Sequence, residues 1–427
     1  MTRLPDLTES TPFAALQLSP ALVRAASELG FVTPTPIQLE AIPAVLCGQD
    51  LQACAQTGSG KTAAFALPLL QRLQEQPAHT SRRVRALILV PTRELAAQVG
   101  EVLRSLAQHL PKPLKVAVVF GGVSINPQMM GLRGGADLVV ATPGRLLDLV
   151  AHNALKLSSV NTLVLDEADR LLDLGFADEL TKVLALLPAK RQTLLFSATF
   201  PEAVQTLADH LLTEPVRIEV AATPDTTPAI RQRVIQVDAT QRTPLLRHLI
   251  KTEGWQRVLV FVATQYDAER VADKLYKTGI FATPFHGGLS QGARTQVLDE
   301  FKAERWEVVV TTDLASRGID IAQLPVVLNY DLPRSAVDYL HRIGRTGRAG
   351  ESGLAISFVS AGTEAHFRLI EKRQHLSLPR EQIAGFEPQE VEAPSVAAQE
   401  PGTGGVKGKR PSKKDKLRAA AAQPRSP

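Results

Sequence analysis

The sequence is poor in cysteine and in aromatic residues, and each shortage argues against particular kinds of site. Its 427 residues include only two cysteines, Cys47 and Cys54, too few for a disulfide framework or a cysteine metal site. This composition fits a reducing compartment, and we predict a cytoplasmic protein. Aromatic residues make up only 5% of the chain, so base stacking on aromatic side chains is not expected to be its main way of holding a nucleic acid.

Long hydrophobic runs are also absent, which argues against secretion and membrane insertion. Residues 1–10 contain no apolar segment of the kind found in signal peptides. The longest apolar runs, such as residues 258–263, have the length of a strand and not of a membrane span. With 44% hydrophobic and 21% charged residues, the composition is typical of a soluble globular protein of two or three domains, and we predict no membrane partner.

Excess positive charge is missing from most of the chain. The net charge is +5, but residues 407–427 carry eight lysines and arginines against Asp415 alone, a net of +7, which leaves residues 1–406 at −2. From about Pro388 the content of Pro, Ala, Gln, Gly and Lys rises and hydrophobic periodicity disappears. We therefore predict a disordered basic tail over residues 388–427. It either raises affinity for a nucleic acid of any sequence through counterion release or is a solvated tail without a role.

Apolar segments of strand length alternate with amphipathic segments along two stretches of the chain. Residues 19–30 form one predicted helix, because their apolar positions recur at helical spacing. Such alternation indicates parallel strands covered by helices on both faces. The predicted strands are 51–55, 86–90, 115–120, 137–141, 162–165 and 193–197 in the first stretch, and 234–238, 257–262, 281–284, 308–311, 326–330 and 353–359 in the second.

A segment rich in Thr, Pro and Ala separates the two stretches at residues 221–230 and indicates an interdomain linker. The predicted fold class is therefore α/β, with two domains of similar size. We place the first domain at residues 1–217, the linker at 218–230, the second domain at 231–387 and the tail at 388–427. No direct sequence repeat is visible between the two domains.

A glycine-rich segment follows the first predicted strand at residues 55–62. Gly58 and Gly60 lack a Cβ, so the backbone N–H groups can turn toward an anion. Lys61 would add a charge for β- and γ-phosphates, the Thr62 hydroxyl is placed to ligate magnesium, and a helix from about Ala63 would point its N-terminus at the phosphates. The usual phosphate-loop pattern has glycine where this chain has Ala55. A glycine-rich turn that binds nothing is the alternative.

Two carboxylates, Asp166 and Glu167, follow a buried predicted strand, where ligands of α/β sheets bind. Beside a phosphate loop, the first would hold magnesium and the second would polarise an attacking water. The alternative is that Asp166 caps the next helix and Glu167 lies in its first turn. The phosphate loop at residues 55–62 favours the catalytic interpretation.

The residues from Asp166 to Asp169 spell DEAD, and the chain resembles the DEAD-box RNA helicase family from Phe13 to Phe367. No motif of that family is missing or broken. In the phosphate loop of that family, alanine at the first position is normal. The other matching motifs of the first predicted domain are Phe31, 34–38 and the upstream Phe13 (Q motif), 91–96 (Ia), Gly121 and Gly122 (GG), 142–145 (Ib) and 197–199 (III). Those of the second are 260–264 (IV), Gln291 and Arg294 (QxxR), Thr312, Asp313, Arg317, Gly318 and Asp320 (V), and His341, Arg342, Gly344, Arg345, Gly347 and Arg348 (VI).

This resemblance implies two tandem RecA-like domains that bind ATP and Mg²⁺ between them. In this chain the implied catalytic residues are Lys61, Asp166, Glu167 and two arginines of the second domain, Arg345 and Arg348, which would stabilise charge on the γ-phosphate. Gln38 would read the adenine edge and Asp320 would meet the ribose. The implied nucleotide-binding residues are Phe13, Phe31, Gln38, Thr57, Gly58, Ser59, Gly60, Lys61, Thr62, Gly318 and Asp320, and the implied magnesium ligands are Thr62 and Asp166.

The resemblance also implies a groove for single-stranded RNA, read through its backbone and not its sequence. Ser197 and Thr199 would couple the two sites through hydrogen bonds toward Asp169, or would simply be turn hydroxyls at a strand end. The arginines of motif VI could instead lie on a solvated helix face, although Gly344 and Gly347 argue against it. The implied RNA-binding residues are Arg93, Gly121, Gly122, Thr142, Arg145, Thr264, Gly287, Arg294 and Thr312.

We therefore predict a monomeric, ATP-dependent RNA helicase that separates strands locally and remodels RNA, with ribosomal precursors or RNA decay machinery as further partners. Within the family, residues 166–176 and the short basic end look most like the bacterial RhlE-type proteins. A ribosomal-RNA-binding domain of the DbpA-like type is not expected. Two rivals stay open: a slowly hydrolysing RNA clamp or assembly scaffold, and a DNA translocase on the same core.

Overall fold

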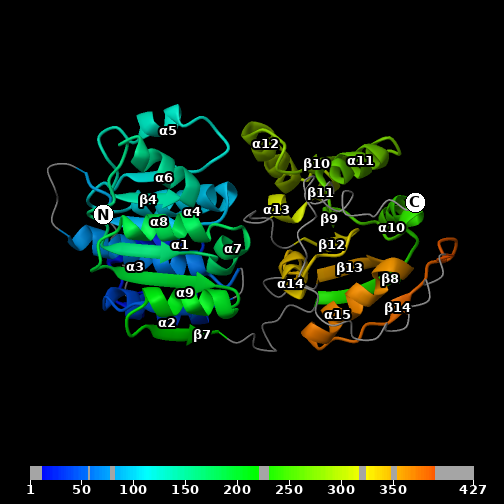
Figure 1. Cartoon of the computed structure of the whole chain (residues 1–427), viewed down its shortest axis with the longest axis horizontal. Coiled ribbons are helices and arrows are strands. Elements are labelled where there is room, and N and C mark those ends of the chain that lie inside the picture. Colours follow the sequence, from blue (N-terminus) through cyan, green and yellow to red (C-terminus); the bar gives the residue numbers. More distant parts are fainter. Residues whose placement is uncertain are drawn as a thin grey trace, which may run out of the picture.

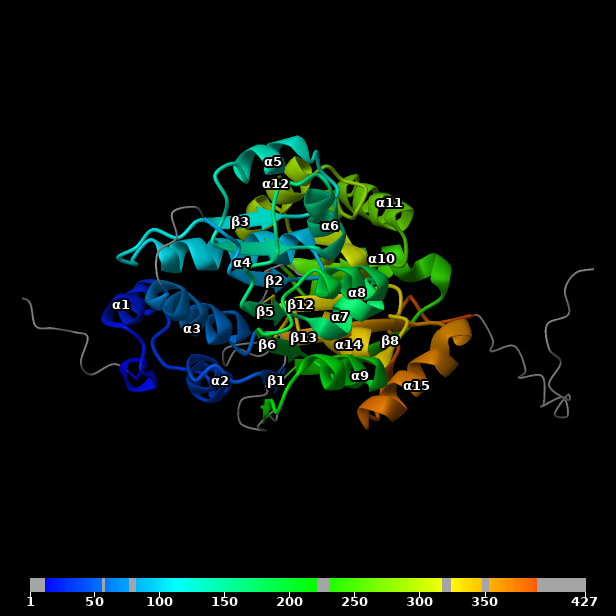
Figure 2. The same cartoon turned by 60° about the vertical axis from the view of Figure 1, so that its left-hand side comes forward.

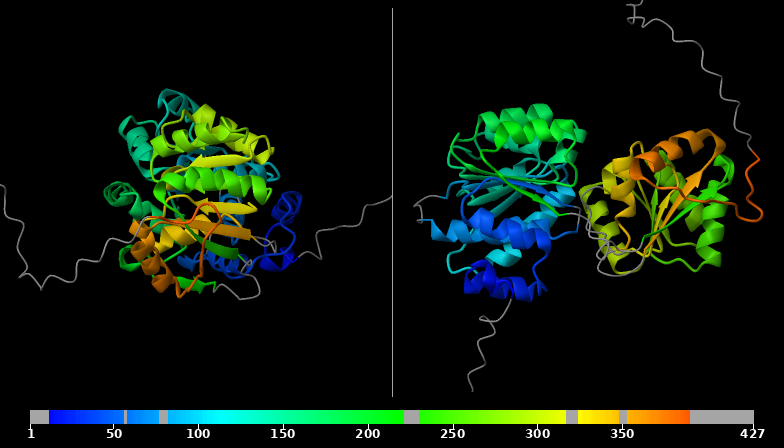
Figure 3. Two further views of the ribbon diagram at one scale, coloured as in Figure 1. Left: turned by 90° about the vertical axis from the view of Figure 1, so that its right-hand side faces the viewer. Right: turned by 90° about the horizontal axis from the view of Figure 1, so that it is seen from below.

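The computed structural model describes residues 12–55, 58–76, 82–220, 230–316, 324–347 and 353–389. These residues form two α/β domains that lie side by side, the first at the left of Figure 1 and the second at the right. The view from below in Figure 3 shows the same two lobes. No described helix combines the length and the apolar character needed to cross a membrane. Residues 390–427, most of the predicted tail, lie outside the described residues.

The elements of the first domain are the helices η1 (Ala14–Leu16), α1 (Pro20–Glu28), α2 (Pro36–Leu46), α3 (Lys61–Glu75), α4 (Arg93–Ala107), α5 (Asn126–Gly131), α6 (Pro143–Ala151), α7 (Ala168–Asp173), α8 (Ala177–Ala185) and α9 (Glu202–Leu211), and the strands β1 (Leu51–Cys54), β2 (Ala86–Leu89), β3 (Val116–Val119), β4 (Leu138–Ala141), β5 (Thr162–Leu165), β6 (Gln192–Ser197) and β7 (Val216–Glu219).

The elements of the second domain are the helices η2 (Ala239–Gln241), α10 (Arg242–Thr252), α11 (Gln265–Tyr276), α12 (Gln291–Lys302), α13 (Asp313–Ser316), α14 (Ala336–Ile343), η3 (Ala361–Thr363) and α15 (Glu364–Gln374), and the strands β8 (Ile230–Gln236), β9 (Val258–Phe261), β10 (Ala282–Phe285), β11 (Val308–Thr311), β12 (Val326–Asn329), β13 (Gly353–Val359) and β14 (Arg380–Glu381).

The two sheets have the same strand order, although the sequence shows no repeat. The first runs β3-β4-β2-β5-β6-β1-β7 and the second β10-β11-β9-β12-β13-β8-β14, so each strand of one has a counterpart at the same place in the other. All the pairings are parallel. The predicted fold class, two RecA-like domains with parallel sheets, is confirmed.

Each sheet is covered by helices on both faces, as its continuous apolar strands require. In β2, Ile88 packs into the cluster formed with α1 to α4, whereas its neighbours Leu87 and Leu89 pack into the cluster formed with α6 to α9. Figure 2 shows α1, α2 and α3 on one side of the first sheet and α7, α8 and α9 on the other. Side chains that alternate along a strand thus fill two separate cores.

The sequence-based elements differ from the structure at three places. Helix α3 begins at Lys61 and not at Ala63. The edge strands β7 and β14 were not predicted, because little of β7 is buried and β14 has only two residues. Strand β7 continues the first sheet through Glu219, and β8 begins at Ile230, so both strands enter the range 218–230 predicted as linker. Residues 221–229 lie outside the described residues.

Candidate active site between the two domains

The predicted functional residues gather at the carboxyl ends of the parallel strands. The phosphate loop follows β1, Thr92 and Arg93 follow β2, and Thr142 follows β4. Asp166 follows β5, and Ser197 ends β6. Because parallel strands all end at the same edge, residues far apart in sequence meet there.

The phosphate loop is held in shape by backbone conformations that favour glycine. Gly58 and Gly60 have φ values of 86° and 90°, and Gly60 caps α3. The Lys61 side chain is 7% exposed, and its Nζ donates to the carbonyl of Ala55 over 2.8 Å. Gln56 and Thr57 lie outside the described residues, so the expected nucleotide contact of Thr57 stays a prediction.

The Q-motif residues Thr35 and Gln38 bind the phosphate loop directly. The Thr35 hydroxyl donates to the Ser59 carbonyl over 2.7 Å, and the Gln38 side-chain amide donates to the Gly60 carbonyl over 3.1 Å. The Gln38 side-chain oxygen accepts from the Thr35 N–H at 3.0 Å. Both ends of the carboxamide thus have a protein partner here, and its second N–H and second oxygen lone pair stay available for an adenine edge.

Gly60 allows this close contact, and we expect Gly60→Ala to abolish ATP binding. A Cβ at residue 60 would lie 2.4 Å from Gln38 Nε2 and 2.9 Å from Thr35 Oγ1, at a φ that disfavours side chains. The loop would have to move away from α2. Calorimetric titration with ATP measures the effect. Gly362→Ala, at a glycine whose added Cβ meets nothing within 4 Å, is the control; wild-type affinity in Gly60→Ala would contradict this account.

Phe13 and Phe31 pack into the first domain's core. Phe13 is 1% exposed and belongs to the buried apolar cluster, and the partly buried Phe31 packs against that cluster. The structure gives these two rings a packing role, and their contact with an adenine stays a prediction.

The acidic pair lies buried beside the phosphate loop. Asp166 is 3% and Glu167 6% exposed, and Glu167 has an unusual positive φ of 52°. Glu167 caps α7 without a side-chain capping bond, and Asp166 accepts the Glu167 N–H at 3.0 Å, so the alternative that Asp166 caps this helix is wrong. Arg170 Nη1 lies 3.1 Å from Glu167 Oε2. This pairing was not apparent from the sequence.

Burial raises the pKa of Asp166 to about 6, with the charges of Glu167 and Asp169 acting in the same direction. The Lys61 ammonium and the Glu167 N–H act in the opposite direction and lower this pKa. Ionisation of Asp166 therefore lowers the stability of the folded protein. A bound cation would offset that loss of stability.

The predicted hydrogen bonds between Asp169, the last residue of the DEAD motif, and both Ser197 and Thr199 are confirmed. Asp169 Oδ2 accepts the Thr199 N–H at 3.1 Å and the Thr199 hydroxyl at 2.9 Å. Ser197 Oγ accepts the Asp169 N–H at 3.2 Å and donates to the Thr199 carbonyl at 2.7 Å. The end of β6 is thereby tied to α7. The coupling role of this connection stays a prediction.

The donor set fits a nucleotide-bound magnesium. Among the described residues Asp166 accepts only one hydrogen bond, so its lone pairs can ligate a cation. Within that part of the chain no group of three or more His, Cys, Asp or Glu could hold a metal unaided. Magnesium usually takes one or two carboxylates and fills its other positions with phosphate oxygens and water, and Asp166 with the Thr62 hydroxyl suits that habit.

The predicted RNA-binding residues of the first domain are connected to one another. The Gly121 N–H donates to the Thr142 hydroxyl over 3.2 Å, and Arg145 Nη2 donates to the Val123 carbonyl over 2.7 Å. Gly122 has φ 81°, and a Cβ there would lie 3.0 Å from Arg93 Nη1. The structure therefore brings these residues together, and their contact with RNA stays a prediction.

Among the residues that the structure describes, one ion pair joins the domains, and it was not predicted. Arg294 Nη2 on α12 lies 2.8 Å from Glu94 Oε1 on α4, with the two side chains 2% and 8% exposed. Arg294 also donates to the carbonyls of His286 and Ala315, and its guanidinium lies 4.7 Å from the Phe285 ring centroid. Arg294 was predicted to contact RNA, but in this arrangement its contacts are with protein groups. The sequence offered no signal for this pairing.

The other predicted residues of the second domain lie at the ends of its strands. The exposed Thr264 follows β9 and caps α11, Gly287 follows β10, and the buried Thr312 follows β11. Arg345 is 6% exposed. Helix α14, which leads to Arg345, lies on the side of the second domain that faces α7 (Figure 1). Gly318, Asp320 and Arg348 lie outside the described residues, so their roles stay predictions.

Arg342 of motif VI has a structural role that the sequence did not indicate. Its Nε and Nη2 donate to the two Asp313 carboxylate oxygens at 2.6 and 2.7 Å, and its Nη1 donates to Asn329 and to the Asp331 carbonyl. The guanidinium lies 4.8 Å from the Phe261 ring centroid. Arg342 is 3% exposed, so it supports α14 from inside and is no part of a solvated basic face.

Comparison with known families identifies both domains. Residues 35–207 match the model of the DEAD/DEAH box helicases, and residues 241–350 match that of the helicase conserved C-terminal domain. The ATP-dependent RNA helicase DbpA of Escherichia coli is 44% identical over 369 residues, which are 86% of this chain and 79% of that protein.

Comparison with solved structures adds further matches. A single-residue variant of S. cerevisiae Dbp5 bound to RNA and ADP BeF3 matches with a TM-score of 0.78 and 31% identity, over 87% of this chain and 96% of that one. The same variant bound to Nup159, a Gle1 variant, IP6 and ADP matches over 86% and 96%, at the same identity, with a TM-score of only 0.59. Since the sequence compared is the same, the chain as a whole superposes better on the RNA-bound form.

Proposed function

This chain belongs to the DEAD-box family of ATP-dependent RNA helicases, and from that premise we propose that its two domains form one split catalytic site, completed only when they meet on an RNA strand. The chain uses ATP and Mg²⁺ and binds RNA, as its family does. The observation that carries the proposal is the buried ion pair of Glu94 and Arg294, which exists only while the domains are together.

The first domain supplies most of the nucleotide-binding groups. Lys61 faces the phosphates, Thr62 and Asp166 hold the magnesium, and Glu167, fixed by Arg170, orients the attacking water. The bound magnesium supplies charge neutralisation at the phosphates. Arg345 and Arg348 come from the second domain and stabilise the charge that develops on the γ-phosphate, a contribution of roughly 10³ to 10⁵ in rate. Hydrolysis therefore requires closure.

Closure is coupled to RNA through the hydrogen bonds between Asp169, Ser197 and Thr199. Hydroxyls and glycine N–H groups of both domains, together with arginines of the first domain, bind the RNA backbone without reading its sequence. A strand bent to fit the closed groove cannot stay in a regular duplex, so closure separates base pairs locally.

The finer assignments belong to the same proposal. We place the chain in the RhlE-type subgroup, with the domain boundaries given above except that β7 extends the first domain to Glu219 and β8 begins the second at Ile230, and we assign it to the cytoplasm as a monomer. Its RNA partners are ribosomal precursors or substrates of RNA decay. The residue assignments beyond the described part of the chain, at Thr57, Gly318, Asp320 and Arg348, rest on the motif match alone.

ATP turnover measured with and without polynucleotide tests the split site. We expect strong stimulation by RNA, weaker stimulation by DNA of equal length, and loss of stimulation in Arg348→Ala, because the γ-phosphate then lacks its second arginine. A duplex-displacement assay with ATP and with a non-hydrolysable analogue distinguishes a helicase from a slow RNA clamp. Equal turnover with and without RNA would contradict the proposal.

A further inference from the structure

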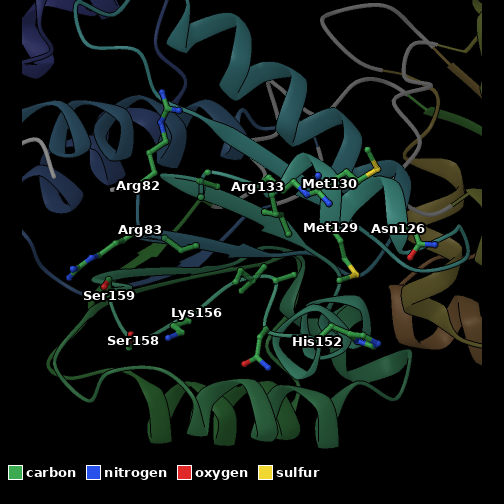
Figure 4. A pocket seen from close by; sticks show the side chains of 18 residues that line it. Arg82, Arg83, Asn126, Met129, Met130, Arg133, His152, Lys156, Ser158 and Ser159 are labelled. Carbon is green, nitrogen blue, oxygen red and sulfur yellow. The ribbon is translucent and has the colours of Figure 1, made fainter. Parts of the chain in front are cut away.

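A second concave site lies at the opposite edge of the first sheet from the nucleotide. It is a cavity of about 1070 Å³, lined by the segments that lead into β2, β4 and β5, the last of which begins at His152 directly after α6, and by residues of α5. Figure 4 shows that it is elongated, with Asn126 and His152 toward one end and Arg83 and Ser159 toward the other. None of the nucleotide or RNA residues assigned above lines it.

The cavity is basic, and several of its charges lack partners. Its lining includes Arg82, Arg83, Arg133, Lys156 and His152, but no aspartate or glutamate. Arg82 pairs with Asp137 at 3.3 Å, whereas within the described ranges the side chains of Arg83, Arg133 and Lys156 have neither a hydrogen-bond nor an ion-pair partner. Because residues 1–406 carry a net charge of −2, this gathering of cations is local and does not reflect a basic domain.

The fold holds these cations around one space. Gly135 has φ 78°, and a Cβ there would lie 2.4 Å from the Arg82 carbonyl oxygen, so the segments bearing Arg82 and Arg133 pack backbone to backbone. Lys115 Nζ donates to the Arg133 carbonyl over 2.9 Å and fixes the same turn. Cations held apart along an elongated cavity suit a chain of phosphates better than one small anion.

One helix that lines the cavity follows closely in the chain on a predicted RNA contact. Helix α5 begins four residues after Gly122, a predicted RNA contact, and its Asn126, Met129 and Met130 line the cavity. We propose that this cavity binds the phosphodiester backbone of the RNA strand after it leaves the groove, so that the first domain holds a longer stretch of RNA than the groove alone. This inference rests on the proposed RNA groove. Ser158 and Ser159 add hydroxyl donors for phosphate or 2′-OH oxygens.

The test compares two strand lengths in the full chain with a non-hydrolysable ATP analogue. Fluorescence anisotropy measures the affinity for an oligoribonucleotide that only fills the groove and for a much longer one. In the triple variant Arg83→Ala, Arg133→Ala, Lys156→Ala, we expect affinity for the longer strand to fall by about tenfold. The slope of log K against log salt should fall by about 2, since each lost single-strand phosphate contact removes about 0.7. Affinity for the short strand should not change.

The control carries the same change in charge elsewhere on the first domain: Arg24→Ala, Lys182→Ala, Lys190→Ala, three exposed cations outside the cavity. It should bind both strands as the wild type does. Unchanged binding of the longer strand by the cavity variant would overturn the proposal and leave an acidic protein segment as the occupant. Equal losses for both strand lengths would also overturn it. Failure of the wild type to bind the short strand would instead contradict the groove itself.

Discussion

Replacing Asp166 with asparagine is expected to stabilise the nucleotide-free protein and to remove its ATP turnover. Burial raises the pKa of this carboxyl from 3.8 to about 6. As the pH rises, Asp166 therefore ionises at a lower pH in the unfolded chain than in the folded protein. Above about pH 6 the folded state then bears a penalty of about 3 kcal/mol, which a neutral side chain of the same shape avoids. The unfolding temperature of Asp166→Asn should therefore exceed that of the wild type at neutral pH.

The pH dependence of the unfolding temperature tests whether the buried carboxylate charge causes this difference in stability. The advantage of the variant should shrink as the pH falls from about 6 toward 3.8, because the wild-type carboxyl becomes protonated in the folded state. ATP with magnesium should stabilise the wild type and not the variant. Turnover should drop by about 10³-fold, since a magnesium ligand is lost and metal ions contribute several kcal/mol at the transition state.

Thermal unfolding scans over this pH range, with and without ATP and magnesium, make the measurement. The control is Asp178→Asn, an exposed carboxylate on α8, which should change neither turnover nor the pH dependence of unfolding. A lower unfolding temperature for Asp166→Asn at neutral pH would show that this buried charge is fully compensated in the free protein. That result would refute the argument from burial.

Replacing Glu94 with glutamine is expected to lower RNA-stimulated ATP turnover by about 10²-fold or more, although Glu94 lies in no nucleotide contact. In the closed arrangement the Arg294 guanidinium is 2% exposed and faces Glu94 at 2.8 Å. Removing one partner of a buried ion pair leaves an uncompensated charge, at a cost of about 3–5 kcal/mol. Glu94 also lies 3.2 Å from Arg93 Nε in its own domain, so the loss of that pair affects the first domain in both states, whereas the loss of the pair with Arg294 affects the closed state alone.

Förster resonance energy transfer between fluorescent labels on the two domains, measured with RNA and a non-hydrolysable ATP analogue, should report a smaller fraction of closed molecules in Glu94→Gln than in the wild type. The second single variant, Arg294→Met, removes the charge from the other side. If the pair acts as a unit, the double variant should lose much less than the sum of the two single losses. Glu101→Gln, an exposed glutamate on the same helix, is the control. Additive losses, or normal closure in Glu94→Gln, would refute the role of the pair.

The sequence predicted most of what depends on local pattern. The buried strands could be found because their residues are continuously apolar, as in β2 and β11, where every residue is buried. The edge strands β7 and β14 escaped because a short strand with one open edge needs no such run. Helix α3 begins at Lys61, two residues earlier than predicted, because Gly60 caps it and the Gly60 carbonyl accepts the Ala64 N–H.

By itself the sequence determined the fold class, the family and the order of the functional motifs, because hydrophobic periodicity and motif spacing are properties of neighbouring residues. Only the tertiary structure decided which distant groups meet. The partners of Gln38 in the phosphate loop, the pairing of Glu94 with Arg294 across the domains, and the basic cavity at the amino ends of β2, β4 and β5 all join segments far apart in the chain. Such contacts depend on strand order and domain placement, and residue spacing carries no information about either.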